Sequence, residues 1–180
     1  MILESIRKRF PPRSDMIAVL AVAVFVCFSW TIIGFFNKLS SFILYFTPGE
    51  IANIFAFMMA FALLESLAAA GLLILLSAVL PSSWLKEGFA FKGFVILLVA
   101  TITAILFQKA LRDHFPSMQT LLTYSLLPML LMALLVWFIH SRPRLQKILL
   151  SVQDRILIML FIYVPIGVIG LLVVMARDLL

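Results

Sequence analysis

The sequence predicts an all-α, polytopic membrane protein built as a bundle of five transmembrane helices, and two observations lead to that prediction. Hydrophobic residues make up 64% of the 180 residues and charged residues 12%, whereas soluble domains average about 45–50% apolar and about 25% charged residues. Long windows without charge also recur along the chain. The chain is too apolar to cover itself with polar surface in water, so we expect one compact domain in a lipid bilayer.

Five windows are long enough to cross a membrane, since a helix needs about 20 apolar residues to span the hydrocarbon core. The predicted spans are residues 16–36, 48–79, 89–111, 117–139 and 156–176. The third span has only 16 charge-free residues between Lys92 and Lys109. Both lysines are therefore expected to extend toward the head groups.

Helix boundary signals support these limits. Thr47, Pro48 and Glu50 form a capping-box pattern, with Thr47 as the N-cap and proline at the first helical position. This pattern predicts that the second span begins at residue 48. Pro128 and Pro165 lie inside the fourth and fifth spans, where membrane helices tolerate proline because neighbouring groups satisfy the freed carbonyl. We expect kinks there rather than breaks.

The distribution of Lys and Arg predicts the orientation. With five spans, ten of these residues fall on the side of the N-terminus and four on the opposite side. Positive residues concentrate in the cytoplasm. The N-terminus is therefore expected in the cytoplasm and the C-terminus outside, as in a small inner-membrane protein of the cell membrane.

Two connecting stretches are expected at membrane surfaces. Residues 143–154 carry apolar residues at helical spacing, which predicts a short cytoplasmic amphipathic helix before the last span. Its apolar positions are Leu145, Ile148, Leu149 and Val152. Residues 38–46 hold an apolar run too short to cross. Either they lie in the head-group layer or they form a re-entrant turn.

The sequence contains no recognised catalytic pattern. Metal-ligand spacing, a nucleophile motif, paired intramembrane carboxylates and a phosphate-binding loop are all missing. His114 and His140 fall on opposite sides of the predicted membrane. We therefore expect no enzymatic activity, no cofactor and no metal, and the lack of a predicted soluble domain argues against a nucleic-acid partner.

Glu65 is the main candidate for a functional residue because it lies in the middle of the longest apolar window. A charged side chain at the centre of a membrane helix costs about 2.5–3.5 kcal/mol on the insertion scale. No Lys or Arg is predicted at the same depth, so we expect a protonated carboxyl group, enclosed by helices, that donates a hydrogen bond to another helix. It could instead bind a partner subunit, or carry a proton or a substrate.

Small residues at four-residue spacing lie on the same span as Glu65. This small-residue stripe consists of Ala56, Ala60, Ala62, Ser66 and Ala70. Small residues at this spacing allow another helix backbone to approach closely. The stripe is therefore expected at a helix–helix interface.

Basic residues near the predicted membrane surfaces are candidates for contacts with lipid head groups or a partner. On the outer side these are Lys109, Arg112 and His114, and on the cytoplasmic side Arg142, Arg144 and Lys147. Clusters of this kind are also typical of solvated helix ends.

The function expected from the sequence is that of a non-enzymatic integral membrane subunit, or an accessory or assembly factor of a larger membrane complex. Its partners would be the lipid bilayer and either another membrane protein or a second copy of the chain. The alternative is a small transporter or substrate-binding membrane module that uses Glu65.

Overall fold

The computed structural model describes residues 10–80, 85–113 and 118–178. Over these residues the regular structure is helical, with no strand. The helices are α2 (Arg13–Tyr45), α3 (Pro48–Val79), α4 (Phe89–Asp113), α5 (Met118–His140) and α6 (Pro143–Asp178). All five are long and apolar enough to cross a membrane.

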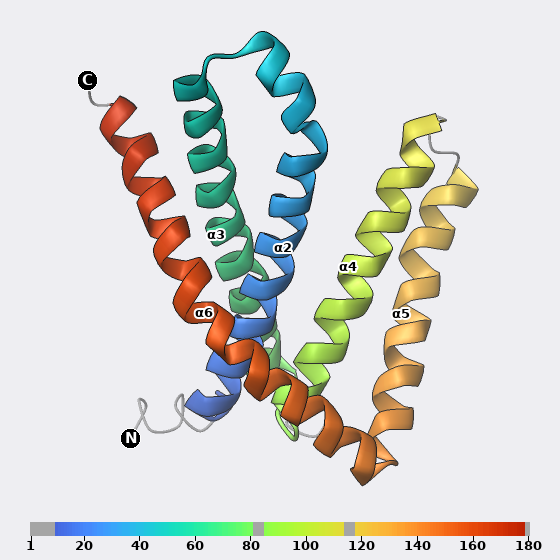
Figure 1. The fold of residues 1–180 in the computed structure, drawn as a ribbon. Coiled ribbons are helices and arrows are strands. Elements are labelled where there is room, and N and C mark those ends of the chain that lie inside the picture. Colours follow the sequence, from blue (N-terminus) through green and yellow to red (C-terminus); the bar gives the residue numbers. More distant parts are fainter. Residues whose placement is uncertain (1–9, 81–84, 114–117, 179–180) are drawn as a thin grey trace.

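The helices form two arms that diverge (Figure 1). Helices α2, α3 and α6 pack against one another as the first arm, and α4 and α5 form a hairpin as the second arm. The arms meet at the closed end, where α2 and α4 begin, and separate toward the open end, where α2 ends and α3 begins. Helix α6 starts beside the end of α5, passes the base of α4 and continues along α2 and α3, so it links the two arms.

Two buried clusters hold the first arm together and attach the second arm to it. Near the closed end, Val19 and Val22 of α2 pack with Leu73 of α3 and Phe94 of α4. Gly93 allows this approach, because a Cβ atom there would lie 2.6 Å from Cγ2 of Val19. The close packing of α4 on α2 is thus confined to the closed end.

The second cluster lies farther along the first arm. Its buried members are Val24 and Phe28 of α2 and Met59, Ala62 and Leu63 of α3. Tyr163 of α6 stacks on Phe28, with 5.2 Å between the ring centroids. Because α4 contributes no buried residue here, this cluster stabilises only the three-helix arm.

Residues 38–45 continue α2 as a helix, so the re-entrant turn considered above is wrong. No Gly or Pro interrupts this stretch. Phe42 also contacts the ring of Phe35 two turns earlier, which in turn packs on Phe55 of α3. Aromatic packing against α3 therefore favours continuation of the helix over a turn.

Residues 143–154 are helical, but they do not form a separate short helix as predicted. They are the first third of α6, which runs on without interruption because no Gly or Pro lies between Pro143 and Pro165. The side of this segment that packs on the protein includes Gln146 and Gln153. Gln146 Nε2 donates to the carbonyl oxygens of Ile139 and His140 at 3.2 and 3.0 Å.

The capping box at the start of α3 is confirmed. The backbone amide of Thr47 donates to Glu50 Oε2 at 2.8 Å, and the Glu50 amide donates to Thr47 Oγ1 at 3.4 Å. Pro128 and Pro165 lie within α5 and α6 without ending them. The local signal at residues 47–50 therefore predicted the start of α3 correctly.

Candidate functional site

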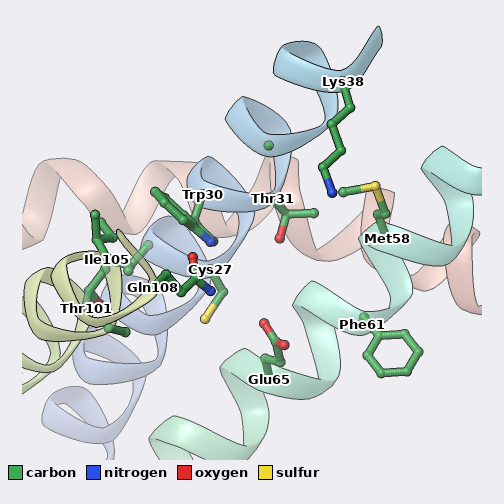
Figure 2. Close-up of a pocket in the computed structure, with 13 residues that line it drawn as sticks. Cys27, Trp30, Thr31, Lys38, Met58, Phe61, Glu65, Thr101, Ile105 and Gln108 are labelled. Atoms are coloured by element: carbon green, nitrogen blue, oxygen red, sulfur yellow. The ribbon is translucent and has the colours of Figure 1, made fainter. Parts of the chain in front are cut away.

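A cleft of about 600 Å³ lies between the two arms, on the side toward the open end. Three helices line it. The lining residues are Val26, Cys27, Trp30, Thr31, Gly34 and Lys38 of α2; Met58, Phe61 and Glu65 of α3; and Thr101, Ala104, Ile105 and Gln108 of α4. Figure 2 shows that side chains from all three helices converge on the same space.

Glu65 projects into this cleft from the middle of α3 (Figure 2). Its side chain is exposed, and it makes no hydrogen bond or ion pair with any other residue that the structure describes. The prediction that helices of the same chain enclose Glu65 and accept a hydrogen bond from it is therefore wrong. Neighbouring Ala62 and Ser66 face the packed side of α3, whereas Glu65 lies on the side from which α4 diverges.

Lys38 lines the same cleft, which the sequence did not predict. The first span was expected to end at residue 36, so Lys38 was assigned to a loop. Because α2 continues to Tyr45, Lys38 lies on the helix face of Thr31 and Cys27, at seven and eleven residues from them. Figure 2 shows its side chain directed toward the cleft. The spacing of 27, 31, 34 and 38 was the signal that could have found it.

The remaining polar groups of the cleft have little hydrogen bonding of their own. Thr101 Oγ1 donates to the carbonyl oxygen of Leu97 at 2.8 Å, so it offers the cleft only an acceptor. Gln108 on α4 is exposed and makes no hydrogen bond within the described part of the chain. Cys27 is half-buried, and Trp30 is 41% exposed. The wall therefore presents the Glu65 carboxyl group, the Lys38 amine and the Gln108 amide, together with the Thr31 hydroxyl, the Cys27 thiol and the Trp30 indole.

The small-residue stripe lies at contacts within the chain. Ala60, Ala62, Ser66 and Ala70 are buried, and Ala56 is half-buried. Gly170 of α6 packs against the backbone of Ala56 and Ala60. Ser66 Oγ donates to the carbonyl oxygen of Leu63 at 2.8 Å and so offers no donor to the cleft.

None of the basic candidates whose side chains the structure describes lines the cleft. Lys109 is exposed on α4, and Arg144 and Lys147 are exposed on α6. Arg142 lies over the ring of Phe138, 5.6 Å from its centroid. The Arg112 side chain and His114 lie outside the described residues.

Lys92 does not extend to the surface as predicted. It is 4% exposed, and its Nζ lies 5.9 Å from the centroid of the Phe91 ring. Nearby, Gln153 Nε2 of α6 donates to the Ala90 carbonyl oxygen at 3.4 Å, so the first turn of α4 lies against α6. This tertiary contact between distant segments has no counterpart in the local sequence.

Among the described residues, no three His, Cys, Asp or Glu side chains come together as a metal site. Comparison with protein families, with curated proteins and with solved structures gives no match. The chemistry of the cleft is therefore interpreted from its own residues.

Proposed function

We propose that this protein is a non-enzymatic integral membrane module that binds a small polar ligand in the cleft between its two arms. The exposed Glu65 carboxyl group is the observation that carries the proposal. Ionisable residues within membrane helices are rare and mark functional sites, because the charge must be compensated. Since no described residue of the chain compensates it, a ligand from outside the chain does.

The dimensions of the cleft support this proposal. Small-molecule sites have volumes of about 300–1,000 Å³ and combine apolar walls with a few polar groups. The cleft measures about 600 Å³. Apolar side chains such as Val26, Met58 and Ile105 alternate there with the polar groups described above.

The cleft is accessible from the open end and closed at the other. Phe94 and Gly93 pack α4 on α2 at the closed end. We place the N-terminus in the cytoplasm, with the first third of α6 along the cytoplasmic surface. The cleft then opens in the outer half of the bilayer, where a ligand enters from outside or sideways from the lipid.

A subunit or accessory role in a larger membrane complex is the second candidate, and helix α5 favours it. None of the residues in the apolar window of α5 is buried. Its contacts within the described chain are with α4 and, to a smaller extent, α6. A helix of a partner membrane protein, or of a second copy, has room to pack along it.

Cys27 provides a direct test, because it is the one cysteine of the sequence and it lines the cleft. We expect a charged methanethiosulfonate reagent to label Cys27 in the purified protein reconstituted in vesicles. In a Cys27→Ser background, Ala23→Cys should stay unlabelled, because residue 23 is fully buried. Leu126→Cys, on the exposed face of α5, should also stay unlabelled by a charged reagent in lipid.

Two outcomes would count against ligand binding. If Cys27 reacts only after denaturation, the cleft is closed and the proposal is wrong. If Cys27 is protected in native membranes and becomes reactive only when a co-purifying membrane protein is removed, the second candidate is correct.

A further inference from the structure

The cleft carries opposite charges at two heights. Glu65 lies at the inner part of the cleft, near the middle of α3, and Lys38 lies toward the open end of α2. Met58, which lines the cleft on α3, is seven residues nearer the open end than Glu65, or about 10 Å along a helix. Figure 2 shows Lys38 directed into the cleft from that outer part.

The two side chains do not neutralise each other. Neither Lys38 nor Glu65 makes an ion pair or a hydrogen bond with another described residue. Charges in surroundings of low dielectric constant interact strongly, and an unpaired charge there is costly. Each group therefore favours a ligand group of opposite charge at its own height.

This arrangement selects among ligand classes. A purely cationic ligand would be attracted by Glu65 and repelled by Lys38, and a purely anionic ligand would experience the reverse. A ligand with both charges satisfies both groups. Apolar lining residues, including Val26, Phe61 and Ile105, suit hydrocarbon attached to such a ligand.

We infer, on the basis of the proposed function, that the cleft binds a zwitterion whose ammonium group lies beside Glu65 and whose anionic group lies beside Lys38. Gln108, which makes no hydrogen bond within the described part of the chain, lines the cleft from α4 beside Cys27 (Figure 2). Two sources share this chemistry: the head group of a zwitterionic phospholipid that enters sideways, and a free phosphoethanolamine-like molecule from outside.

Protection of Cys27 from the charged thiol reagent measures binding in the purified full chain in a nonionic detergent. The probes are dihexanoylphosphatidylethanolamine, dihexanoylphosphatidylglycerol and free phosphoethanolamine. The quantity compared is the concentration for half-protection rather than the labelling rate, because Glu65 and Cys27 line the same cleft and a change of charge there alters the reactivity of the thiol.

We expect the phosphatidylethanolamine to protect at a concentration about tenfold lower than the phosphatidylglycerol, which corresponds to about 1.4 kcal/mol. Glu65→Gln should remove this preference while keeping the shape of the side chain. Lys38→Gln should weaken protection by the phosphatidylethanolamine about tenfold, and Lys38→Arg should restore it. Glu87→Gln, at an exposed residue between α3 and α4, is the matched control and should change neither value.

Some outcomes identify where the zwitterion comes from, and others show that the cleft does not bind a zwitterion. Protection by free phosphoethanolamine as effective as by the lipid identifies a soluble ligand, and protection by the lipid alone identifies a head group; both support the zwitterion. Equal protection of Cys27 by both lipids overturns the inference, and so does protection that Glu65→Gln leaves unchanged, provided that this variant elutes at the same volume as the native protein. In either case the labelling of Cys27 still supports an accessible cleft. Absence of Cys27 labelling in the native protein overturns the proposed function as well.

Discussion

Gly170 of α6 lies against the backbone of Ala56 of α3, so closely that a Cβ atom on residue 170 would lie 2.5 Å from the Ala56 carbonyl oxygen. Gly167, one turn earlier, would place a Cβ atom 2.9 Å from that of Leu63. Small residues on both helices thus bring α3 and α6 into backbone contact, the usual means of helix association where no hydrophobic effect acts between helices.

Gly170→Ala should therefore lower the free energy of unfolding by about 1–3 kcal/mol, because an added methyl group in a packed interface forces the backbones apart. Denaturant titration followed by circular dichroism measures the change. Gly71→Ala is the control, since nothing lies within 4 Å of a Cβ atom there. That variant should be neutral or more stable by about 0.5–1 kcal/mol because alanine favours the helix. Equal effects at the two positions would contradict this account of the interface.

Gln153→Met should leave stability unchanged or raise it. Gln153 is 1% exposed, its Nε2 donates to the Ala90 carbonyl at a long 3.4 Å, and its Oε1 has no hydrogen-bond partner among the described residues. An unsatisfied buried acceptor costs about 1–3 kcal/mol, more than a long hydrogen bond contributes. Thermal unfolding provides the measurement, with Gln146→Met as the comparison that loses two satisfied bonds. A larger loss at 153 than at 146 would show that Oε1 has a partner outside the described chain.

Glu65→Leu should stabilise the ligand-free protein in lipid by up to about 3 kcal/mol, because the substitution removes an uncompensated charge from a membrane helix. Glu65→Gln should have a smaller effect in the same direction. Steric-trap or denaturant unfolding in bicelles measures both, with Asp154→Asn, at an exposed residue of α6, as the reference. Destabilisation by leucine would mean that Glu65 forms a stabilising contact within the protein, contrary to its exposure in the cleft.

Alkaline phosphatase fused after residue 180 should be active, because the C-terminus is expected outside the cytoplasm. The ten-to-four distribution of Lys and Arg across five spans predicts this orientation. Alkaline phosphatase and green fluorescent protein fusions give opposite signals on the two sides. A fluorescent fusion at the C-terminus, with an inactive phosphatase, would require an even number of crossings.

The sequence predicted the elements of the fold better than their packing. Start signals such as Thr47 and Glu50 act within one helix turn, so local patterns located the helices correctly. The sequence analysis separated residues 143–154 from the span 156–176 because the charge-free window begins only at residue 156. A charged residue at position 155 interrupts that window but does not end a helix, so α6 continues through it.

The site was predicted only in part, for a physical reason. The sequence identified Glu65 through the cost of its charge, and that cost does not depend on the neighbours of the helix. Whether the carboxyl group is enclosed depends on the divergence of α4 from α3, which arises from tertiary packing near Gly93 and Phe94. Lys38 was missed because the end of α2 was placed nine residues too early.

The helices of the two arms differ in length, which matters for the bilayer itself. Helices α2 and α3 have 33 and 32 residues, and α4 and α5 have 25 and 23. At 1.5 Å per residue the first pair is on average about 13 Å longer than the second. Helices longer than the hydrocarbon thickness tilt to fit it. We therefore expect the long pair to tilt more than the short hairpin in a thin bilayer and less in a thick one, so that the angle between the two arms depends on membrane thickness.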